Sequence, residues 1–159
     1  MREMTITNLG TMQDLRAAAR CNPRRRIHRV LHRDEAGQPD FGAALQALVV
    51  AGVPGTYVMP HRFDRDQCFA VLTGEWGFLF WDLEGRFTHA KICAPGEVIH
   101  IPTDTGYHTW VCLQPGTLLE TLPGPHSGGR HDLSDYPVEG TESAARVLRS
   151  WEDTLGAQR

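Results

Sequence analysis

The sequence predicts an all-β fold, a barrel or sandwich built from short antiparallel strands. Turns of the form Xaa-Pro-Gly recur along the chain, and in them proline presets φ at the second turn position while glycine supplies the positive φ at the third. Short runs of valine, isoleucine, leucine and aromatic residues flank the turns, and the gaps leave no room for crossover helices. The turns are Val53-Pro54-Gly55, Ala94-Pro95-Gly96 and Gln114-Pro115-Gly116.

A barrel core is expected over about 43–122 of a chain, 1–159, that forms one domain. The tetrapeptide Asp82-Leu83-Glu84-Gly85 is typical of a hairpin loop with its glycine in the left-handed conformation. The stretch 123–140 is rich in Pro-Gly and Gly-Gly pairs and is predicted to be loop. The expected strands are 43–52, 56–62, 67–73, 75–82, 86–92, 97–101, 107–113 and 117–122.

Two helices are expected to flank the barrel. A short N-terminal helix covers 11–21, with Thr11 as its N-cap and Asp14 in its first turn. A C-terminal helix covers about 142–155, capped by Thr141 and ended by Gly156. Its apolar residues recur at helical spacing and should pack on the barrel exterior or on a partner subunit. They are Ala144, Leu148, Trp151 and Leu155.

The composition indicates a globular protein without a nucleic-acid or membrane partner. Lys plus Arg is 16 and Asp plus Glu is 19, which gives a net charge of −3. The protein therefore lacks the strong positive charge with which proteins bind nucleic acids or membrane surfaces. No apolar run reaches the ~18 residues that span a bilayer, and the first residues lack the apolar core of a secretory signal. The 4 cysteines form no CxxC pair, which argues against a zinc ribbon and favours a cytoplasmic location.

The segment that begins at Gly55 carries polar residues at a recognisable spacing, GTYVMPHRFDRDQCFAVLTG. It resembles the first motif of the cupin superfamily, which has a glycine, a His-x-His pair, a glutamate and a second glycine. The spacing is intact as far as Gly74, and His61 fills the first histidine slot. However, Phe63 stands in the second histidine slot and Gln67 in the glutamate slot.

A second segment, which begins at Gly96, resembles the other cupin motif. It reaches Pro102 and then His108 with one extra residue between them, and its final asparagine slot is not filled. Over about 23–125 the chain is similar to the WbuC family of small bacterial cupins, through Leu31-His32, PGTYVMPHR, VLTG, DLEG and Glu120 followed by Gly124-Pro125. The resemblance implies a double-stranded β-helix (jelly-roll) cupin barrel with a pocket, and a link to surface-polysaccharide pathways.

The metal site that the resemblance implies lacks two of its ligands. Metal-binding cupins hold a divalent ion through three histidines and one carboxylate, and here only His61 and His108 keep their imidazoles. With the neutral amide of Gln67 they should bind Fe, Ni or Zn weakly or not at all, unless Asp64, Asp66 or Glu120 replaces the carboxylate. The expected cofactor is therefore none, or a weakly bound divalent metal at His61, Gln67 and His108.

The segment 20–33, RCNPRRRIHRVLHR, concentrates six arginines and two histidines in a chain that is otherwise acidic. The planar guanidinium fork suits carboxylate and phosphate groups, so this segment could hold an anionic ligand at the barrel mouth. A solvated surface, or ion pairs between two copies of the chain, explains the same charges. The resemblance favours Arg26 and His32 for the pocket, together with Phe63, Gln67 and Glu120.

Three functions remain open at this point. The first is a pocket for a small anionic sugar or carboxylate, with isomerase or epimerase chemistry in which His61 or His108 is the general base. Tyr57 and Tyr107 are candidate acids, although strand parity turns each away from its neighbouring histidine. The second is a metal-dependent dioxygenase or isomerase, and the third is a ligand-binding or sensor module without catalysis. A homodimer is expected, in which TITNL at 5–9 could pair with a neighbour.

Overall fold

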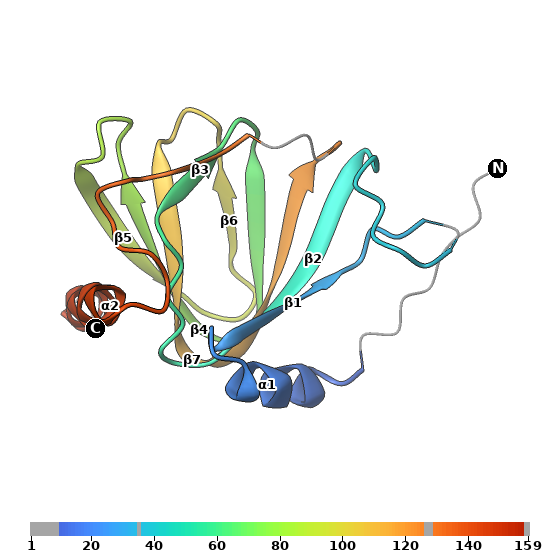
Figure 1. The fold of residues 1–159 in the computed structure, drawn as a ribbon, viewed down its shortest axis with the longest axis horizontal. Helices are drawn as coiled ribbons and strands as arrows, with labels where there is room; N and C mark the ends of the chain where they lie inside the picture. The colour runs from blue at the N-terminus through green and yellow to red at the C-terminus, as the bar shows by residue number, and fades with distance from the viewer. Residues whose placement is uncertain (1–9, 35, 126–128, 158–159) are drawn as a thin grey trace.

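Antiparallel strands curl into a barrel that lies between two helices (Figure 1), which confirms the predicted all-β architecture. The computed structural model describes residues 10–34, 36–125 and 129–157. The helices and strands are α1 (Met12–Cys21), β1 (Arg26–Val30), β2 (Leu45–Gly52), β3 (His61–Phe63), β4 (Gln67–Trp81), β5 (Phe87–Cys93), β6 (Val98–Ile101), β7 (Tyr107–Pro123), β8 (Arg130–Asp132) and α2 (Glu142–Gly156).

The two longest strands, β4 and β7, contribute to both walls of the barrel. In the first wall, β1 pairs with β2, β2 with the second half of β7, and that half with the first half of β4, which also pairs with β6. In the second wall, β8 pairs with β3, β3 with the first half of β7, and the second half of β4 with both β7 and β5. All of these pairings are antiparallel, as a jelly-roll barrel requires.

The continuity of β4 and β7 corrects the predicted strand count. Two strands were predicted at 67–73 and 75–82, but these residues form the single bent strand β4. The strands predicted at 107–113 and 117–122 likewise form the single strand β7, and the predicted turn at Pro115-Gly116 lies inside it. The bend occurs where the two strands approach most closely: a Cβ on Gly74, which has φ +78°, would lie 2.6 Å from Cα of Gly116. Because both positions are glycine, the strands can pass from one wall to the other without breaking.

Three other strand predictions were also wrong. The segment at 26–30 forms β1 and the segment at 130–132 forms β8, although the first was treated only as basic and the second as loop. Both strands lie at the ends of the pairing order and carry arginine and histidine, so they lack the apolar alternation that marks a strand. The strand expected at 56–62 is reduced to His61–Phe63. The segment expected to pair between subunits, at 5–9, lies outside the described residues.

Both helices and most turns follow the sequence prediction. Thr11 and Asp14 form a capping box on α1, and the Thr141 hydroxyl accepts the Ala144 N–H at the start of α2. Glycines at the turns and the hairpin have positive φ, at Gly55, Gly85 and Gly96. Neither helix in the described ranges is long and apolar enough to cross a membrane.

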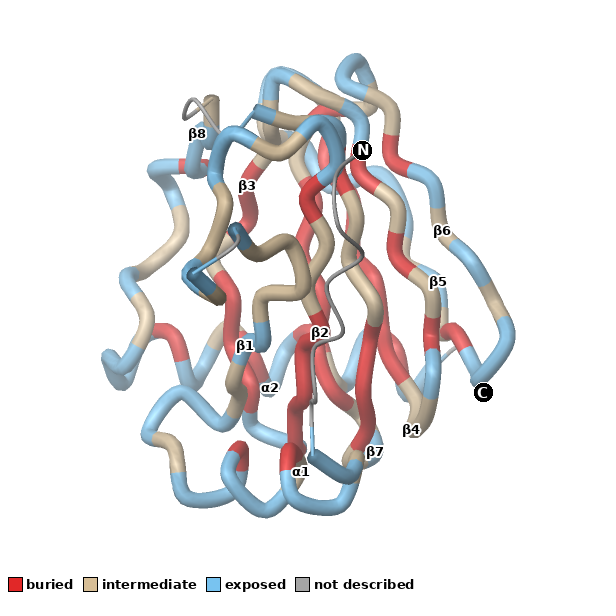
Figure 2. Tube along the Cα trace, turned by 90° about the vertical axis from the view of Figure 1, so that its right-hand side faces the viewer, coloured by how far each residue is buried: buried red, intermediate tan, exposed pale blue. Residues whose placement is uncertain are grey.

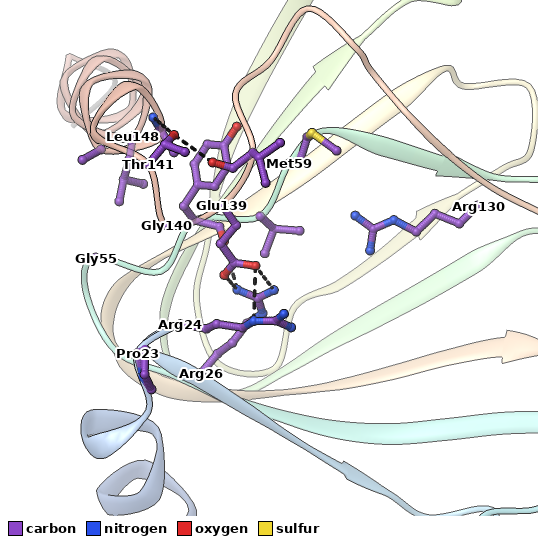
Figure 3. Close-up of a pocket in the computed structure, with 15 residues that line it drawn as sticks. Pro23, Arg24, Arg26, Gly55, Met59, Arg130, Glu139, Gly140, Thr141 and Leu148 are labelled. Carbon is purple, nitrogen blue, oxygen red and sulfur yellow. Dashed lines mark hydrogen bonds and ion pairs between the residues drawn. The ribbon is translucent and has the colours of Figure 1, made fainter.

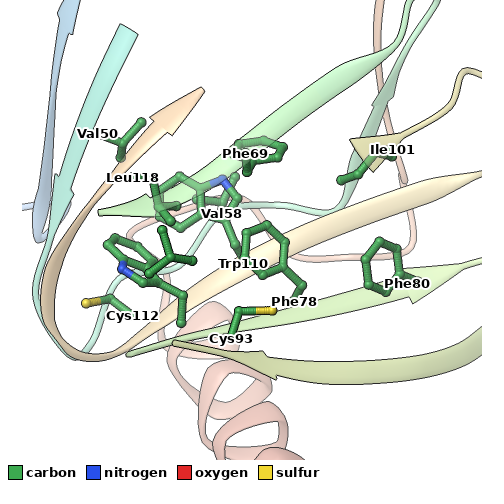
Figure 4. Packing of buried hydrophobic residues seen from close by; sticks show 12 residues of the cluster. Val50, Val58, Phe69, Phe78, Phe80, Cys93, Ile101, Trp110, Cys112 and Leu118 are labelled. Atoms are coloured by element: carbon green, nitrogen blue, oxygen red, sulfur yellow. The ribbon is translucent and has the colours of Figure 1, made fainter. Parts of the chain in front are cut away.

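Three apolar layers hold the fold together. One lies between α1 and the first wall, a second fills the barrel, and a third, which contains the predicted stripe of α2, lies against the second wall. Figure 2 shows the buried residues concentrated along β2, β4 and β7. Large buried side chains such as Trp76, Phe78 and Trp110 belong to the cluster that fills the barrel. Figure 4 shows Phe78 and Trp110 close to each other inside it. The buried side chains of Gln67 and His108 lie away from the bend, near the starts of β4 and β7.

Candidate functional site

Two buried histidines face each other inside the barrel. His61 on β3 and His108 on β7 are register partners, with ring centroids 4.8 Å apart and exposures of 4% and 1%. The ring of Phe63 meets the His61 ring edge-on at 5.4 Å, which confirms that the two side chains share a strand face. The two motifs found in the sequence thus meet in space.

The two imidazoles differ in their hydrogen bonds. His61 Nδ1 lies 2.9 Å from the carbonyl oxygen of Met59, so Nδ1 carries the proton and Nε2 keeps its lone pair. Both ring nitrogens of His108 are buried and have no hydrogen-bond partner among the described residues. Burial and the charge of Arg130 lower the pKa of His61 to about 3. Burial, with smaller effects of His61 and Arg130, places the pKa of His108 well below its usual value.

A carboxyl and a carboxamide are linked to the histidines through Phe63, which contacts the His61 ring and lines a cavity with Glu120. Gln67 at the start of β4 is 2% exposed, and its Nε2 donates to Glu120 Oε1 on β7 at 2.9 Å. Burial raises the pKa of Glu120 to about 7, although the Gln67 bond and the charge of Arg130 act in the opposite direction. Glu120 is therefore the group in this cluster that exchanges a proton near neutral pH.

A cavity of about 140 Å³ opens next to this cluster. It brings together three of the predicted ligand-binding residues, His32, Phe63 and Glu120. Phe63 also touches the His61 ring, so its side chain contacts both the cavity and the histidine pair. Gln67 reaches the cavity only through its hydrogen bond to Glu120.

Arg26 lies in a different place from the other predicted ligand-binding residues. It lines a larger cavity, of about 640 Å³, between the start of β1, the segment 55–59 and the start of α2 (Figure 3). Its guanidinium binds both carboxylate oxygens of Glu139 and donates to the Tyr57 carbonyl at 2.9 Å. An internal carboxylate thus already occupies the fork that was expected to hold an anionic ligand.

Arg130 is a site residue that the sequence did not reveal. It lies on β8 opposite Phe63, lines the larger cavity, and its charge acts on His61, His108 and Glu120. Asp132 accepts from its Nη2 at 2.7 Å. A three-residue edge strand offers no apolar period, and no local signal in 123–140 points to this arginine.

The candidate tyrosine acids lie outside the barrel. Tyr57 stacks on Trp151 of α2, and its hydroxyl donates to the Pro137 carbonyl at 2.8 Å. Tyr107 packs in the same outer layer, so the parity argument is confirmed for this residue, which is next to His108 on β7. Tyr57 lies before β3 and four residues from His61, so its outward position does not follow from strand parity. Neither tyrosine hydroxyl faces the histidines, and neither is therefore placed to act as an acid beside them.

The donor groups were tested against the metal site of the cupins. Within the described ranges, no three His, Cys, Asp or Glu side chains lie close enough together to hold a metal ion. The proposed substitutes are used elsewhere, since Asp64 pairs with His131 at 2.9 Å and Asp66 with His100 at 3.1 Å. Two imidazoles fall short of the three or four protein ligands of a usual zinc site, so this donor set does not fit a tightly held divalent ion.

Known proteins resemble this chain mainly in structure. Residues 8–93 match the family described as Domain of unknown function (DUF6016), and no curated protein matches. The polyketide cyclase RemF from Streptomyces resistomycificus superposes with TM-score 0.54 and 20% identity over 82% of this chain and 84% of that one. For the DMSP lyase DddQ from Ruegeria pomeroyi DSS-3 the TM-score is 0.53 and the identity 24%, over 74% of this chain and 54% of that one. A cupin superfamily protein from Desulfitobacterium hafniense DCB-2 gives a TM-score of 0.48 at 15% identity, over 62% and 76%.

Proposed function

Because the chain belongs to the family described as Domain of unknown function (DUF6016), and its strands form a cupin barrel, we propose that the barrel binds a small anionic molecule. The observation that carries this proposal is the buried imidazole of His108, with neither nitrogen bonded within the described residues. Burial of a polar group without a partner is costly, so a site that keeps one is suited to a ligand that supplies it. Arg130 supplies the positive charge that an anion needs.

The groups around this site support acid–base chemistry on the bound molecule. His61 presents the lone pair of Nε2, and neutral His108 offers one N–H donor. Glu120, with a pKa of about 7, can give or take a proton at neutral pH. We therefore propose a proton-transfer reaction of the isomerase or epimerase type on a sugar acid or other carboxylate, in line with the predicted relation to the WbuC family.

A thermal-shift experiment tests the ligand class. The wild-type protein is heated with a panel of carboxylates, each paired with the neutral alcohol of the same skeleton, such as glucuronate with glucose. We expect at least one carboxylate to raise Tm while its neutral counterpart does not. Arg130→Gln should abolish the increase, whereas the control Arg146→Gln should retain it, because Arg146 lies on the exposed face of α2.

Two outcomes would contradict the proposal: equal effects of charged and neutral compounds, and a carboxylate effect that survives Arg130→Gln. If a carboxylate binds but is never converted, even at high protein concentration, the protein is a ligand-binding or sensor module without catalysis. Glu120→Gln then serves as the discriminating variant. At or below pH 7 it should stop turnover in an enzyme and leave affinity within about threefold.

A metal-dependent enzyme is the second candidate. It is favoured by the hydrogen bond from His61 Nδ1 to Met59, which leaves the lone pair of Nε2 available to coordinate a metal close to the His108 ring. It would need a third donor from outside the described residues. Plasma mass spectrometry of untagged protein from metal-supplemented cultures is expected to find far less than one equivalent of Fe, Ni or Zn. Near one equivalent, lost in His108→Ala, would overturn the metal-free proposal.

A further inference from the structure

We propose that the cavity of about 140 Å³ is a subsite for the uncharged end of the ligand, a compact apolar group that carries one oxygen acceptor, and that His32 recognises this oxygen. This inference rests on the proposed function, because the cavity adjoins the same Glu120, and it names the chemistry of the ligand's second end. The recognising group is the Nε2–H of His32, which lines the cavity.

The hydrogen bonds around His32 fix its tautomer. Nδ1 lies 2.9 Å from both the backbone nitrogen and the carbonyl oxygen of Ala47. The carbonyl already accepts the Leu31 N–H at 2.8 Å, whereas Nδ1 is the acceptor that the described residues offer to the Ala47 N–H. Nδ1 is therefore the acceptor and Nε2 carries the proton. This Nε2–H is buried and has no partner in the described part of the chain.

The walls of the cavity define the size and polarity of its occupant. A volume of about 140 Å³ is close to that of an engineered apolar cavity of about 150 Å³ that binds benzene. A five-membered ring or a branched chain with one oxygen is of matching size. Most of the lining is apolar, so the occupant must be apolar over most of its surface. The lining residues are Val30, His32, Phe41, Gln46, Leu48, Phe63, Glu120 and Leu122.

The charges around the two cavities support an uncharged occupant here. Among the described residues, no arginine or lysine lines the smaller cavity, whereas Arg24, Arg26 and Arg130 all line the larger one. An anionic group in the smaller cavity would lack a countercharge and would lie against the carboxyl of Glu120, but a carbonyl, ether or hydroxyl oxygen needs only the one donor of His32. The anionic end of the ligand is thus directed to Arg130, and the neutral end to His32.

The rim of the cavity is built to cover a small apolar group. Phe41 meets the His32 ring edge-on, with centroids 6.2 Å apart, and is 55% exposed. Buried Gln46 donates to the Phe41 carbonyl at 2.9 Å and so holds the backbone beneath this ring. An exposed aromatic ring on a fixed backbone gives an apolar ligand a surface to pack against.

Nitrogen-15 NMR of the full-length protein tests the tautomer directly. The His32 ring should show a protonated Nε2 and a bare Nδ1. Binding is then measured by NMR titration with cyclopentanone and with methylcyclopentane, which has the same shape without the carbonyl. We expect wild-type protein to bind both probes, with cyclopentanone shifting the His32 Nε2–H signal.

A matched variant isolates the His32 donor. In His32→Asn the amide oxygen can still accept the Ala47 N–H, but the donor into the cavity is lost. Cyclopentanone should bind this variant roughly fivefold or more weakly, while methylcyclopentane binds unchanged. Leu122→Phe should fill the cavity and abolish binding of both probes, and His100→Asn on the exposed face of β6 should change neither affinity.

Three results would overturn the inference: a proton on Nδ1 of His32, no binding of either probe to the wild type, or an unchanged cyclopentanone affinity in His32→Asn. These results are independent of the carboxylate panel. If the carboxylates fail and cyclopentanone binds in a His32-dependent way, the proposed function falls and the subsite stands. If the carboxylates bind through Arg130 and cyclopentanone does not bind, the subsite falls alone.

Discussion

Acid is expected to destabilise the wild-type protein more than a His61→Asn variant, by roughly 5 kcal/mol once the pH has fallen below 3. The pKa of His61 is lowered from 6.5 in the unfolded chain to about 3 in the fold. Between these values the unfolded state binds more protons than the native state, so the free energy of unfolding falls as the pH falls. Burial causes most of the shift, because the folded protein offers no water to a charged imidazole at this position.

The variant keeps the hydrogen bond of the native ring while removing its titration. The side-chain N–H of asparagine can donate to the Met59 carbonyl as Nδ1 does, although some packing against Phe63 is lost. Denaturant unfolding at intervals from pH 7.5 to 4 measures the difference, of which roughly 3 kcal/mol should be present by pH 4. His100→Asn, at an exposed histidine, controls for general effects of the substitution. A difference between wild type and His61→Asn that does not vary with pH would show that His61 titrates as it does in water.

The part of the site that depends on strand parity and motif spacing could be predicted from the sequence. His61 and Phe63 are two residues apart on a strand, so they had to share a face, and the second motif placed His108 opposite them. The same reasoning predicted that Tyr107, next to His108, faces out of the barrel, whereas the outward position of Tyr57 does not follow from parity because it lies outside β3. Such periodic signals are local, and they survive in any fold that keeps the strands.

The charges around the site could not be predicted, because they arise from contacts between distant segments. Arg26 and Glu139 are 113 positions apart in the sequence. No local sequence pattern predicts that the Glu139 carboxylate binds the Arg26 guanidinium. Arg130 approaches Phe63 only through β8, an edge strand of three residues without apolar alternation. The bend at Gly74 and Gly116 could not be predicted either. Pro115-Gly116 has the composition of a turn, and its place inside a strand depends on its close contact with Gly74, which is distant in the sequence.

The free energy of unfolding of the wild type is expected to fall by about 3 kcal/mol as the pH rises from 4.5 to above 7. The Glu120→Gln variant should not show this fall. The folded pKa of Glu120, about 7, lies above the usual 4.5, so the native state holds a proton that the unfolded state releases. Its contribution to stability is therefore complete below pH 4.5 and is lost as the pH rises through 7. Glutamine resembles the protonated acid and can still accept from Gln67.

Denaturant unfolding between pH 5 and 9 measures this effect, with Glu142→Gln, at an exposed carboxylate, as the control. The stabilities of the two variants should diverge as the pH rises from about 4.5 to 7 and stay parallel above about 7, with Glu120→Gln the more stable. A constant difference between wild type and Glu120→Gln would show that the carboxyl is ionised throughout and cannot act as an acid near pH 7.

The titration of Glu120 also links ligand binding to pH. An anion bound beside Glu120 favours its protonated form, so binding takes up a proton whenever the pH lies above about 7. The affinity of the wild type for a carboxylate ligand should then fall by up to about tenfold per pH unit above 7, and Glu120→Gln should bind with nearly constant affinity. Isothermal titration calorimetry in buffers of different ionisation enthalpy measures the proton uptake directly. If both proteins show the same pH dependence, Glu120 does not contact the anion, and the proton-transfer role falls to His61 and His108 alone.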